Sequence, residues 1–408
     1  MEEVADGGGR DGAGGGSRLS TELGADLGTR LVRHATALRL EAGDAFFTAE
    51  ADRIARLCHR MAERFARGGR LLAVARSPGA RSDARHVAVE FVHPVIVGKR
   101  ALPAIALAPD QVGVLAEPDD MVIAFDPAED LSAATGRGCL TIAFCPETEA
   151  EWTFIPTTTD PSVAQELVES LYHFLWEHVH VFFEHRGLLE GRDARQVHDA
   201  GASSFLYPFL GERETDLEGV IGDVRRSVLM KATETGELRA QTLADGAGTL
   251  LAVARALRHS FDSGGRLLAF GNGGSATDAM DVVADFRMPP ARRAIDLTED
   301  SGILTAIAND IGTEALFARQ IIAYGREGDV AMALSTSGNS DNVIAALAEA
   351  RRRGIVTVAM VGYDGGRVAA EQLADHVVVT RSEHIPRIQE AQASAYHVLR
   401  ELVDRVAA

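Results

Sequence analysis

The two halves of this 408-residue sequence repeat each other, and the repetition limits the folds that the chain can adopt. The stretch ERFARGGRLLAVARSPGARSDARHVAVEF, which begins at Glu63, matches HSFDSGGRLLAFGNGGSATDAMDVVADF, which begins at His259. DDMVIAF then matches GDVAMAL, LTIAF matches VTVAM, and AQELVESLYHFLWEHV matches IQEAQASAYHVLRELV, always in the same order. One shared apolar strand would mean little, but ordered matches that end in Gln-Glu and Tyr-His at equal spacing indicate two copies of one unit.

Each copy alternates short strands rich in Val, Ile, Leu and Ala with amphipathic helices. This pattern is typical of the α/β class, in which a parallel sheet is covered by helices on both faces. We expect a disordered tail at 1–17, a first copy at 18–184, a connector at 185–215 and a second copy at 216–408.

Composition excludes several classes of protein. The chain has 59 acidic and 41 basic residues and a formal charge of −18, which argues against nucleic-acid and anionic-membrane surfaces as partners. No stretch reaches the roughly 18 apolar residues of a membrane span. Three cysteines are too few for a disulfide scaffold, so we expect free thiols and a cytoplasmic location.

Two loops of the second copy have the composition of phosphate-binding loops. GNGGS at 271–275 joins a strand to a helix, where glycines allow close approach of an anion and the helix N-terminus attracts it. STSGNS at 335–340 opens another helix with four hydroxyl groups. One hydroxyl would suffice as an N-cap, so the excess favours phosphate binding over capping.

These loops, with TEDSGILTAIANDIG and RIQEAQASAYH, resemble the bacterial phosphoheptose isomerases, which contain a sugar isomerase (SIS) domain. The similarity spans 216–406 and extends more weakly to 21–184. It implies two tandem SIS domains, each with a five-stranded parallel sheet flanked by helices. It further implies isomerisation of a phosphorylated sugar such as sedoheptulose 7-phosphate, a bound divalent metal, zinc above all, and a homo-oligomer. Since the family assembles as tetramers, we expect a dimer of two-domain chains.

The resemblance also assigns site residues. The positions that match substrate and phosphate contacts in the family are Asn272, Gly273, Gly274, Ser275, Asn309, Asp310, Ser335, Thr336, Ser337 and Ser340. The family's metal and catalytic groups form a His-x-x-x-Glu pair on one helix and a Gln-x-x-x-x-x-x-x-His pair on the last. Gln389 and His397 match the second pair, but Asp281 and Asp285 stand where histidine and glutamate are expected.

The missing pair occurs in the first copy, where the same alignment gives His86, Glu90, Gln165 and His173. We therefore expect the metal at these four residues rather than at Asp281, Asp285, Gln389 and His397, where carboxylates would favour harder ions. The first copy has in turn lost the phosphate loops. FDPAED, with three carboxylates, stands in place of STSGNS and would repel a phosphate.

Two hypotheses about function follow. In the first, the chain is an isomerase that works through an enediol, with Glu90 and His173, or Asp285 and His397, as the groups that transfer protons. Its centre lies either wholly in the second copy or is shared between the copies. In the second, the chain is a non-catalytic protein that binds sugar phosphates or takes part in protein assembly. For Asp281 and Asp285 themselves, the alternative to a functional pair is a solvated acidic helix face.

Overall fold

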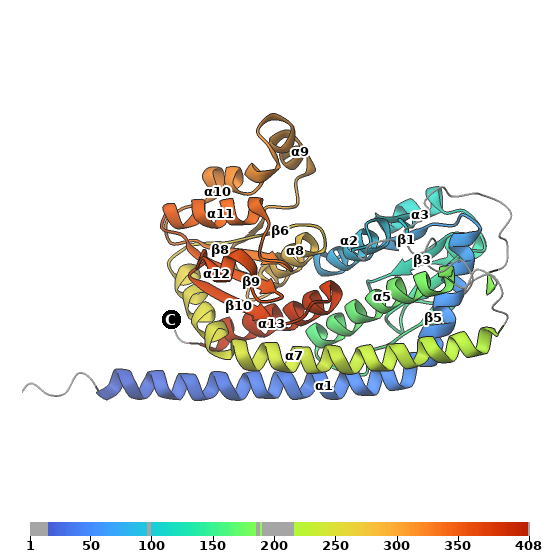
Figure 1. The fold of residues 1–408 in the computed structure, drawn as a ribbon, viewed down its shortest axis with the longest axis horizontal. Coiled ribbons are helices and arrows are strands. Elements are labelled where there is room, and N and C mark those ends of the chain that lie inside the picture. Colours follow the sequence, from blue (N-terminus) through green and yellow to red (C-terminus); the bar gives the residue numbers. More distant parts are fainter. Residues whose placement is uncertain (1–14, 96–98, 185–187, 190–215, 407–408) are drawn as a thin grey trace, which may run out of the picture.

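Each half of the chain forms a five-stranded sheet in which all neighbouring strands are parallel (Figure 1). The computed structural model describes residues 15–95, 99–184, 188–189 and 216–406. In the first half the strands are β1 (Leu71–Val74), β2 (Ala104–Leu107), β3 (Met121–Ala124), β4 (Leu140–Ala143) and β5 (Trp152–Thr153). In the second half they are β6 (Leu267–Gly271), β7 (Ala294–Asp296), β8 (Val330–Ser335), β9 (Val356–Gly362) and β10 (His376–Thr380).

The two sheets have the same topology. The strand order is β2-β1-β3-β4-β5 in the first sheet and, read in the same direction, β7-β6-β8-β9-β10 in the second. Strands β1, β3, β4, β6 and β8 are buried along their whole length, which is why they are runs of apolar residues without polar alternation. The prediction of an α/β fold with two five-stranded parallel sheets is confirmed.

Helices cover both sheets. Those of the first half are α1 (Gly15–Ala66), α2 (Pro78–Val92), α3 (Pro109–Leu115), α4 (Ser132–Gly136) and α5 (Pro161–Glu184). Those of the second half are α7 (Leu217–Asp262), α8 (Gly274–Arg287), α9 (Ser301–Asp310), α10 (Ala318–Tyr324), α11 (Asp341–Arg352), α12 (Gly366–Ala370) and α13 (Ile385–Arg405), with a short 3-10 turn η2 (Thr313–Ala315). No helix in the described part of the chain is long and apolar enough to span a membrane.

The long helices α1 and α7 lie side by side and run beneath both halves (Figure 1). Val32 and Ala35 of α1 are buried in the core of the second half. Val220 and Val224 of α7 are buried in the core of the first. The start of each long helix therefore packs in the core of the other half. The boundaries expected at 18–184 and 216–408 divide the sequence, but each hydrophobic core includes residues from both sides of that division.

Two expectations concern segments at the edges of these units. Helix α1 begins at Gly15, within the last three residues of the tail expected at 1–17. The rest of the tail, 1–14, and most of the connector at 185–215 lie outside the described residues.

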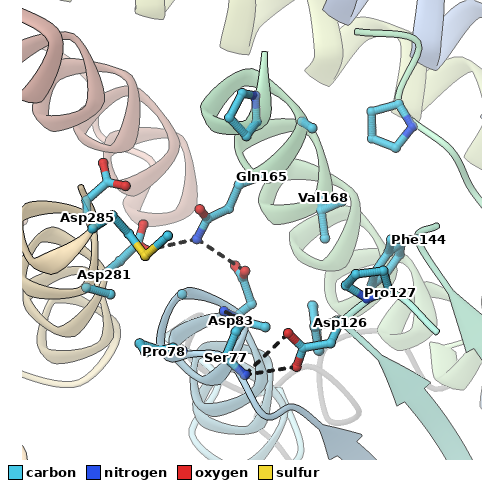
Figure 2. Close-up of a pocket in the computed structure, with 18 residues that line it drawn as sticks. Ser77, Pro78, Asp83, Asp126, Pro127, Phe144, Gln165, Val168, Asp281 and Asp285 are labelled. Atoms are coloured by element: carbon cyan, nitrogen blue, oxygen red, sulfur yellow. Dashed lines mark hydrogen bonds between the residues drawn. The ribbon is translucent and has the colours of Figure 1, made fainter. Parts of the chain in front are cut away.

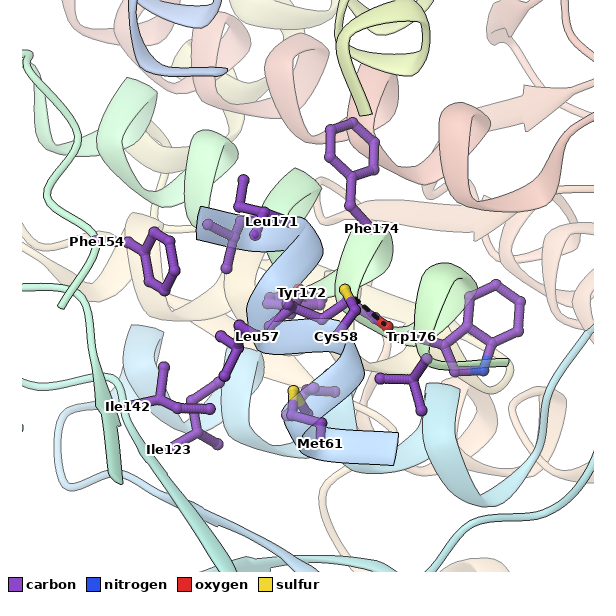
Figure 3. Packing of buried hydrophobic residues seen from close by; sticks show 14 of the residues in the cluster. Leu57, Cys58, Met61, Ile123, Ile142, Phe154, Leu171, Tyr172, Phe174 and Trp176 are labelled. Carbon is purple, nitrogen blue, oxygen red and sulfur yellow. Dashed lines mark hydrogen bonds between the residues drawn. The ribbon is translucent and has the colours of Figure 1, made fainter. Parts of the chain in front are cut away.

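The core of the first half joins α1, α5 and the sheet (Figure 3). Leu57 and Met61 on α1 pack in the same cluster as Leu171 on α5 and as Ile123 and Ile142 on the strands, and all are fully buried. This packing fixes α5 against the sheet. On its other side α5 contacts α13, while α2 contacts α8, so four helices meet between the two sheets.

Candidate active site

Three of the four residues expected to bind a metal come together between α2 and α5. Nε2 of His86 lies 3.4 Å from Nε2 of His173 and 3.8 Å from Oε1 of Glu90. All three side chains are almost completely buried, and their potential ligand atoms form one of the possible metal-binding groups within the described residues. We call His86, Glu90 and His173 the histidine cluster.

The glutamine beside the histidine cluster is Gln389, not Gln165. The amide of Gln389 donates to Nε2 of His86 at 3.1 Å. Gln165 instead donates to Oδ1 of Asp281 at 2.9 Å, so its expected place beside His86 is wrong. The reason is geometric: Gln165 and His173 are eight residues apart on α5, which is about 12 Å along a helix axis. One helix cannot bring both side chains to one ion, and each glutamine reaches across to the other half.

The histidine cluster is rich in hydrogen-bond acceptors. Among the described residues, Oε2 of Glu90 and Oε1 of Gln389 are buried atoms without a hydrogen-bond partner. Burial raises the pKa of Glu90 to about 7. Burial and the neighbouring His173 lower the pKa of His86 well below its usual value. The cluster therefore holds a His86 imidazole with a strongly lowered pKa beside a carboxyl group whose pKa is raised to about 7.

Carboxylates of the second half lie behind both histidines, and sequence reasoning missed them. Nδ1 of His173 donates to Oε1 of Glu390 at 2.9 Å, and Nδ1 of His86 faces Oδ1 of Asp278 at 3.6 Å. Burial alone would raise the pKa of Glu390, but Arg387 and the bond to His173 outweigh burial and lower it to about 2. The sequence contains one signal for Glu390: a glutamate follows the matched glutamine in both halves. That Gln-Glu pair indicated the repetition but not a role for the glutamate.

The glycine-rich loop of the second half borders the histidine cluster directly. A Cβ atom on Gly274 would lie 2.0 Å from Nε2 of Gln389 and 2.9 Å from Nε2 of His86, so a side chain at this position would displace both groups. Gly273 has a φ of 58°, which also favours glycine. Ser275 follows in the first turn of α8 and is buried. The loop expected to bind substrate thus belongs to the same centre as His86.

The hydroxyl-rich loop lies next to the glycine-rich loop, because β6 and β8 are neighbours whose carboxyl ends meet at one edge of the sheet. Ser335 ends β8 and accepts from the main-chain N–H of Gly338 at 3.1 Å. Ser340 is the N-cap residue of α11. Asn272 and Asn342 exchange two amide hydrogen bonds of 2.9 Å, which tie the glycine-rich loop to the first turn of α11. Thr336 and Ser337, between β8 and α11, are half-buried.

Asn309 and Asp310 are not brought to this centre. They end α9, are exposed, and hydrogen-bond to each other at 2.7 Å. In Figure 1, α9 projects from the second half, away from α2, α5 and α13. Within one chain, the structure therefore does not place them beside the histidine cluster, and their contact with a substrate stays a prediction.

A second arrangement, at the positions equivalent to the histidine cluster, contains Asp281, Asp285, His397 and Gln165. Figure 2 shows three of these residues: Asp281, Asp285 and Gln165. Nε2 of His397 lies 3.4 Å from Asp281 and 3.9 Å from Asp285. Burial alone would lower the pKa of His397, but its contacts with Asp281 and Glu166 outweigh burial and raise that pKa well above its usual value. The positive charge of a protonated His397 thus lies beside Asp281 and Asp285, where a metal cation would otherwise lie.

This second arrangement opens into a cavity of about 460 Å³ beside the loops of the first half. The Asp126 carboxylate accepts hydrogen bonds from the main-chain N–H groups of Arg76 and Ser77, so the protein's own anion occupies this loop (Figure 2). Asp281 and Asp285 also line the cavity, and the described lining residues include no Lys, Arg or His. A phosphate would be repelled here, as the sequence predicted.

Comparisons with known proteins agree with these features. The family model for the SIS domain matches residues 232–362. The phosphoheptose isomerase of Pelodictyon phaeoclathratiforme is 41% identical over 180 residues, which cover 42% of this chain and 84% of that protein. The phosphoheptose isomerase of Aquifex aeolicus is 44% identical over 175 residues, which cover 42% of this chain and 87% of the relative.

The fold of both halves together also has counterparts among solved structures. The C-terminal domain of glucosamine-fructose-6-phosphate aminotransferase from Francisella tularensis superposes with a TM-score of 0.60 at 10% identity, over 91% of this chain and 94% of that one. Tagatose-6-phosphate ketose/aldose isomerase from Escherichia coli gives 0.54 at 10% identity, over 93% and 94%. These likenesses concern the fold, whereas the sequence relatives identify the family. The chain belongs to the phosphoheptose isomerase family.

Proposed function

We propose that this chain converts a ketose phosphate such as sedoheptulose 7-phosphate into the aldose phosphate, at one centre built from both halves. The observation that carries the proposal is the position of Gly274, which places the glycine-rich loop of the second half against His86 of the first. The names of the family relatives supply the substrate class.

The second half supplies the groups that hold the substrate. Main-chain N–H groups at the start of α8 and hydroxyls of the 335–340 loop suit the phosphate, since helix N-termini and hydroxyl groups bind anions. Bound in this way, the sugar's carbonyl end extends toward Gln389 and the histidine cluster. The loop after β1 in the first half cannot bind the phosphate in the same way, because the Asp126 carboxylate already accepts from its main-chain N–H groups.

Glu90 is the proposed base. It removes the proton from the carbon next to the substrate carbonyl, an enediol forms as the hydroxyl proton moves between the two oxygens, and Glu90 returns its proton to the neighbouring carbon. A base works best when its pKa is near the working pH, and burial raises the pKa of Glu90 to about 7. Its Oε2 atom has no hydrogen-bond partner among the described groups, so it is free to accept the proton.

The histidine cluster and Gln389 fit a zinc ion. Two imidazole nitrogens 3.4 Å apart have about the spacing of two tetrahedral ligands with Zn–N bonds of about 2.0–2.1 Å. The unpartnered, buried oxygen of Gln389 is a further donor, as is Glu90. When bound, zinc would polarise the carbonyl oxygen of the substrate as a Lewis acid. His173 and His86 would hold it, and Glu390 would orient His173.

We assign no catalysis to Asp285 and His397. Their arrangement faces the Asp126 loop rather than the phosphate loops, and the raised pKa of His397 keeps a proton between the carboxylates. A purely non-catalytic role for the chain is not favoured, because His86, Glu90, His173 and the phosphate loops converge on one place.

The test is an isomerase assay on sedoheptulose 7-phosphate, with zinc measured on the same sample. Turnover that needs about one zinc per chain supports the proposal. Unphosphorylated sedoheptulose is the matched control and should be converted far more slowly. A zinc-loaded, folded protein without turnover would leave only the binding function.

Assembly and location belong to the same proposal. We propose a dimer of chains, which matches the tetramer expected for single-domain relatives, and light scattering on the purified protein tests it. The three cysteines are free, which suits a reducing, cytoplasmic compartment.

A further inference from the structure

Two buried glutamates make the same contact in the two halves. Oε1 of Glu390 on α13 accepts from Nδ1 of His173 at 2.9 Å, and Oε1 of Glu166 on α5 lies 2.9 Å from Nδ1 of His397. Each glutamate directly follows one of the two crossing glutamines in the sequence. Each contact also crosses between the halves, so each histidine is oriented by a carboxylate from the opposite half.

Glu390 is held rigidly in place. Its Oε1 also pairs with Arg387 at 2.9 Å, and its Oε2 accepts from the hydroxyl of Thr235 at 2.8 Å. The side chain is completely buried, as is that of His173. Because the carboxylate is an acceptor only, it fixes the proton of His173 on Nδ1 and leaves the lone pair of Nε2 facing His86 and Glu90.

We propose that Glu390 is a positioning residue of the isomerase centre, which orients His173 and makes it a better zinc ligand from the opposite half of the chain. This inference rests on the proposed function for its catalytic consequence. Glu390 does not touch the substrate in this proposal. It belongs to the second half, yet it determines how well His173 of the first half binds zinc.

The physical effect follows from the bond that Glu390 makes. Without the carboxylate, the proton of His173 can move to Nε2 and block the nitrogen that faces the cluster. Carboxylates behind a metal-binding histidine raise its basicity and hold its ring, and their loss typically costs 10- to 100-fold in metal affinity or activity. We expect Glu390→Gln to weaken zinc binding by a factor in this range.

Glu166 provides a matched control. It is completely buried, makes the same contact with a histidine, and is held by Arg39 at 2.6 Å and by Ser394. It serves His397, however, which belongs to the arrangement beside Asp126. Glu166→Gln therefore removes an equivalent buried charge and should leave zinc binding and turnover at the histidine cluster unchanged.

The experiment measures zinc affinity of the full-length wild type, Glu390→Gln and Glu166→Gln by competition with a coloured zinc chelator. Visible spectra of the cobalt-substituted proteins report the ligand geometry. The expected result is a 10- to 100-fold loss of affinity and an altered cobalt spectrum for Glu390→Gln only. Kinetics should show a fall in kcat with KM nearly unchanged, because the phosphate loops are intact.

Equal zinc affinity in the three proteins would overturn the proposal, and so would equal losses in both variants, which would indicate a general packing effect. If Glu390→Gln does not fold, Glu390→Asp retains the charge for Arg387 but is one bond too short for His173, and it should show the same selective loss. Zinc affinity and cobalt spectra are independent of turnover. An inactive wild type would therefore refute the proposed function without deciding the role of Glu390.

Discussion

Replacing Glu90 by Gln is the sharpest test of a centre shared between the halves. Glu90 is 1% exposed, and its Oε2 atom has no hydrogen-bond partner among the described groups. The substitution therefore removes the base with little change in shape and without breaking a hydrogen bond at that atom. Loss of a proton-transfer group typically costs 10²- to 10⁴-fold in rate. This corresponds to about 3–5 kcal/mol in activation free energy at 1.36 kcal/mol per tenfold change.

The assay compares kcat on sedoheptulose 7-phosphate for Glu90→Gln and Asp285→Asn, with thermal unfolding as the control for folding. Asp285 has a 28% exposed side chain and lines the cavity that contains Asp126. Its replacement should change kcat less than threefold. If instead Asp285→Asn abolishes turnover and Glu90→Gln does not, the centre lies in the second half alone and the reasoning is refuted.

Three further outcomes are expected. Ser335→Ala with Ser337→Ala should weaken binding of the phosphorylated sugar by about 1.5–3 kcal/mol for each lost bond, and calorimetry should show no such change for unphosphorylated sedoheptulose. His86→Ala with His173→Ala should lose its zinc in elemental analysis, and equal metal content in variant and wild type would exclude this site. Val32→Asp on α1 should lower the hydrogen-exchange protection of the second half, because it buries a charge in that core; protection lost only in the first half would contradict the crossed packing.

The sequence predicted the two sheets because their strands are fully buried. Runs such as LLAV and VAMALS leave no polar face, and this pattern distinguishes parallel strands from exposed ones. It could not predict the crossed packing of α1 and α7. Both helices exceed 40 residues, and their apolar positions do not indicate which sheet each turn will cover.

The sequence could have predicted that Gln165 and His173 belong to different sites. An eight-residue spacing on a helix already separates Gln165 from His173 by about 12 Å. The spacing required the two residues to serve different sites, but only the packing of α5 against α13 shows which partner each one finds. The four-residue spacing of His86 and Glu90 places both on one helix face, and the structure brings them together.

Glu390 could not be identified from the sequence because its role depends on a contact between distant segments. It is 217 residues from His173 along the chain. Asn309 and Asp310 show the opposite case: they match a family segment, yet α9 carries them to the surface. A motif match identifies residue types, whereas the path of the chain decides which residues meet.

The crossing of the two halves has a consequence for how the centre responds to dilution. When a centre forms between separate subunits, its groups part once the protein concentration falls below the dissociation constant. Here the histidine cluster and its glutamine are joined by one polypeptide, so the effective concentration of one half around the other is set by the chain and does not depend on dilution. The proposed ligand set therefore comes from a single chain, and synthesis always supplies its two halves in equal numbers.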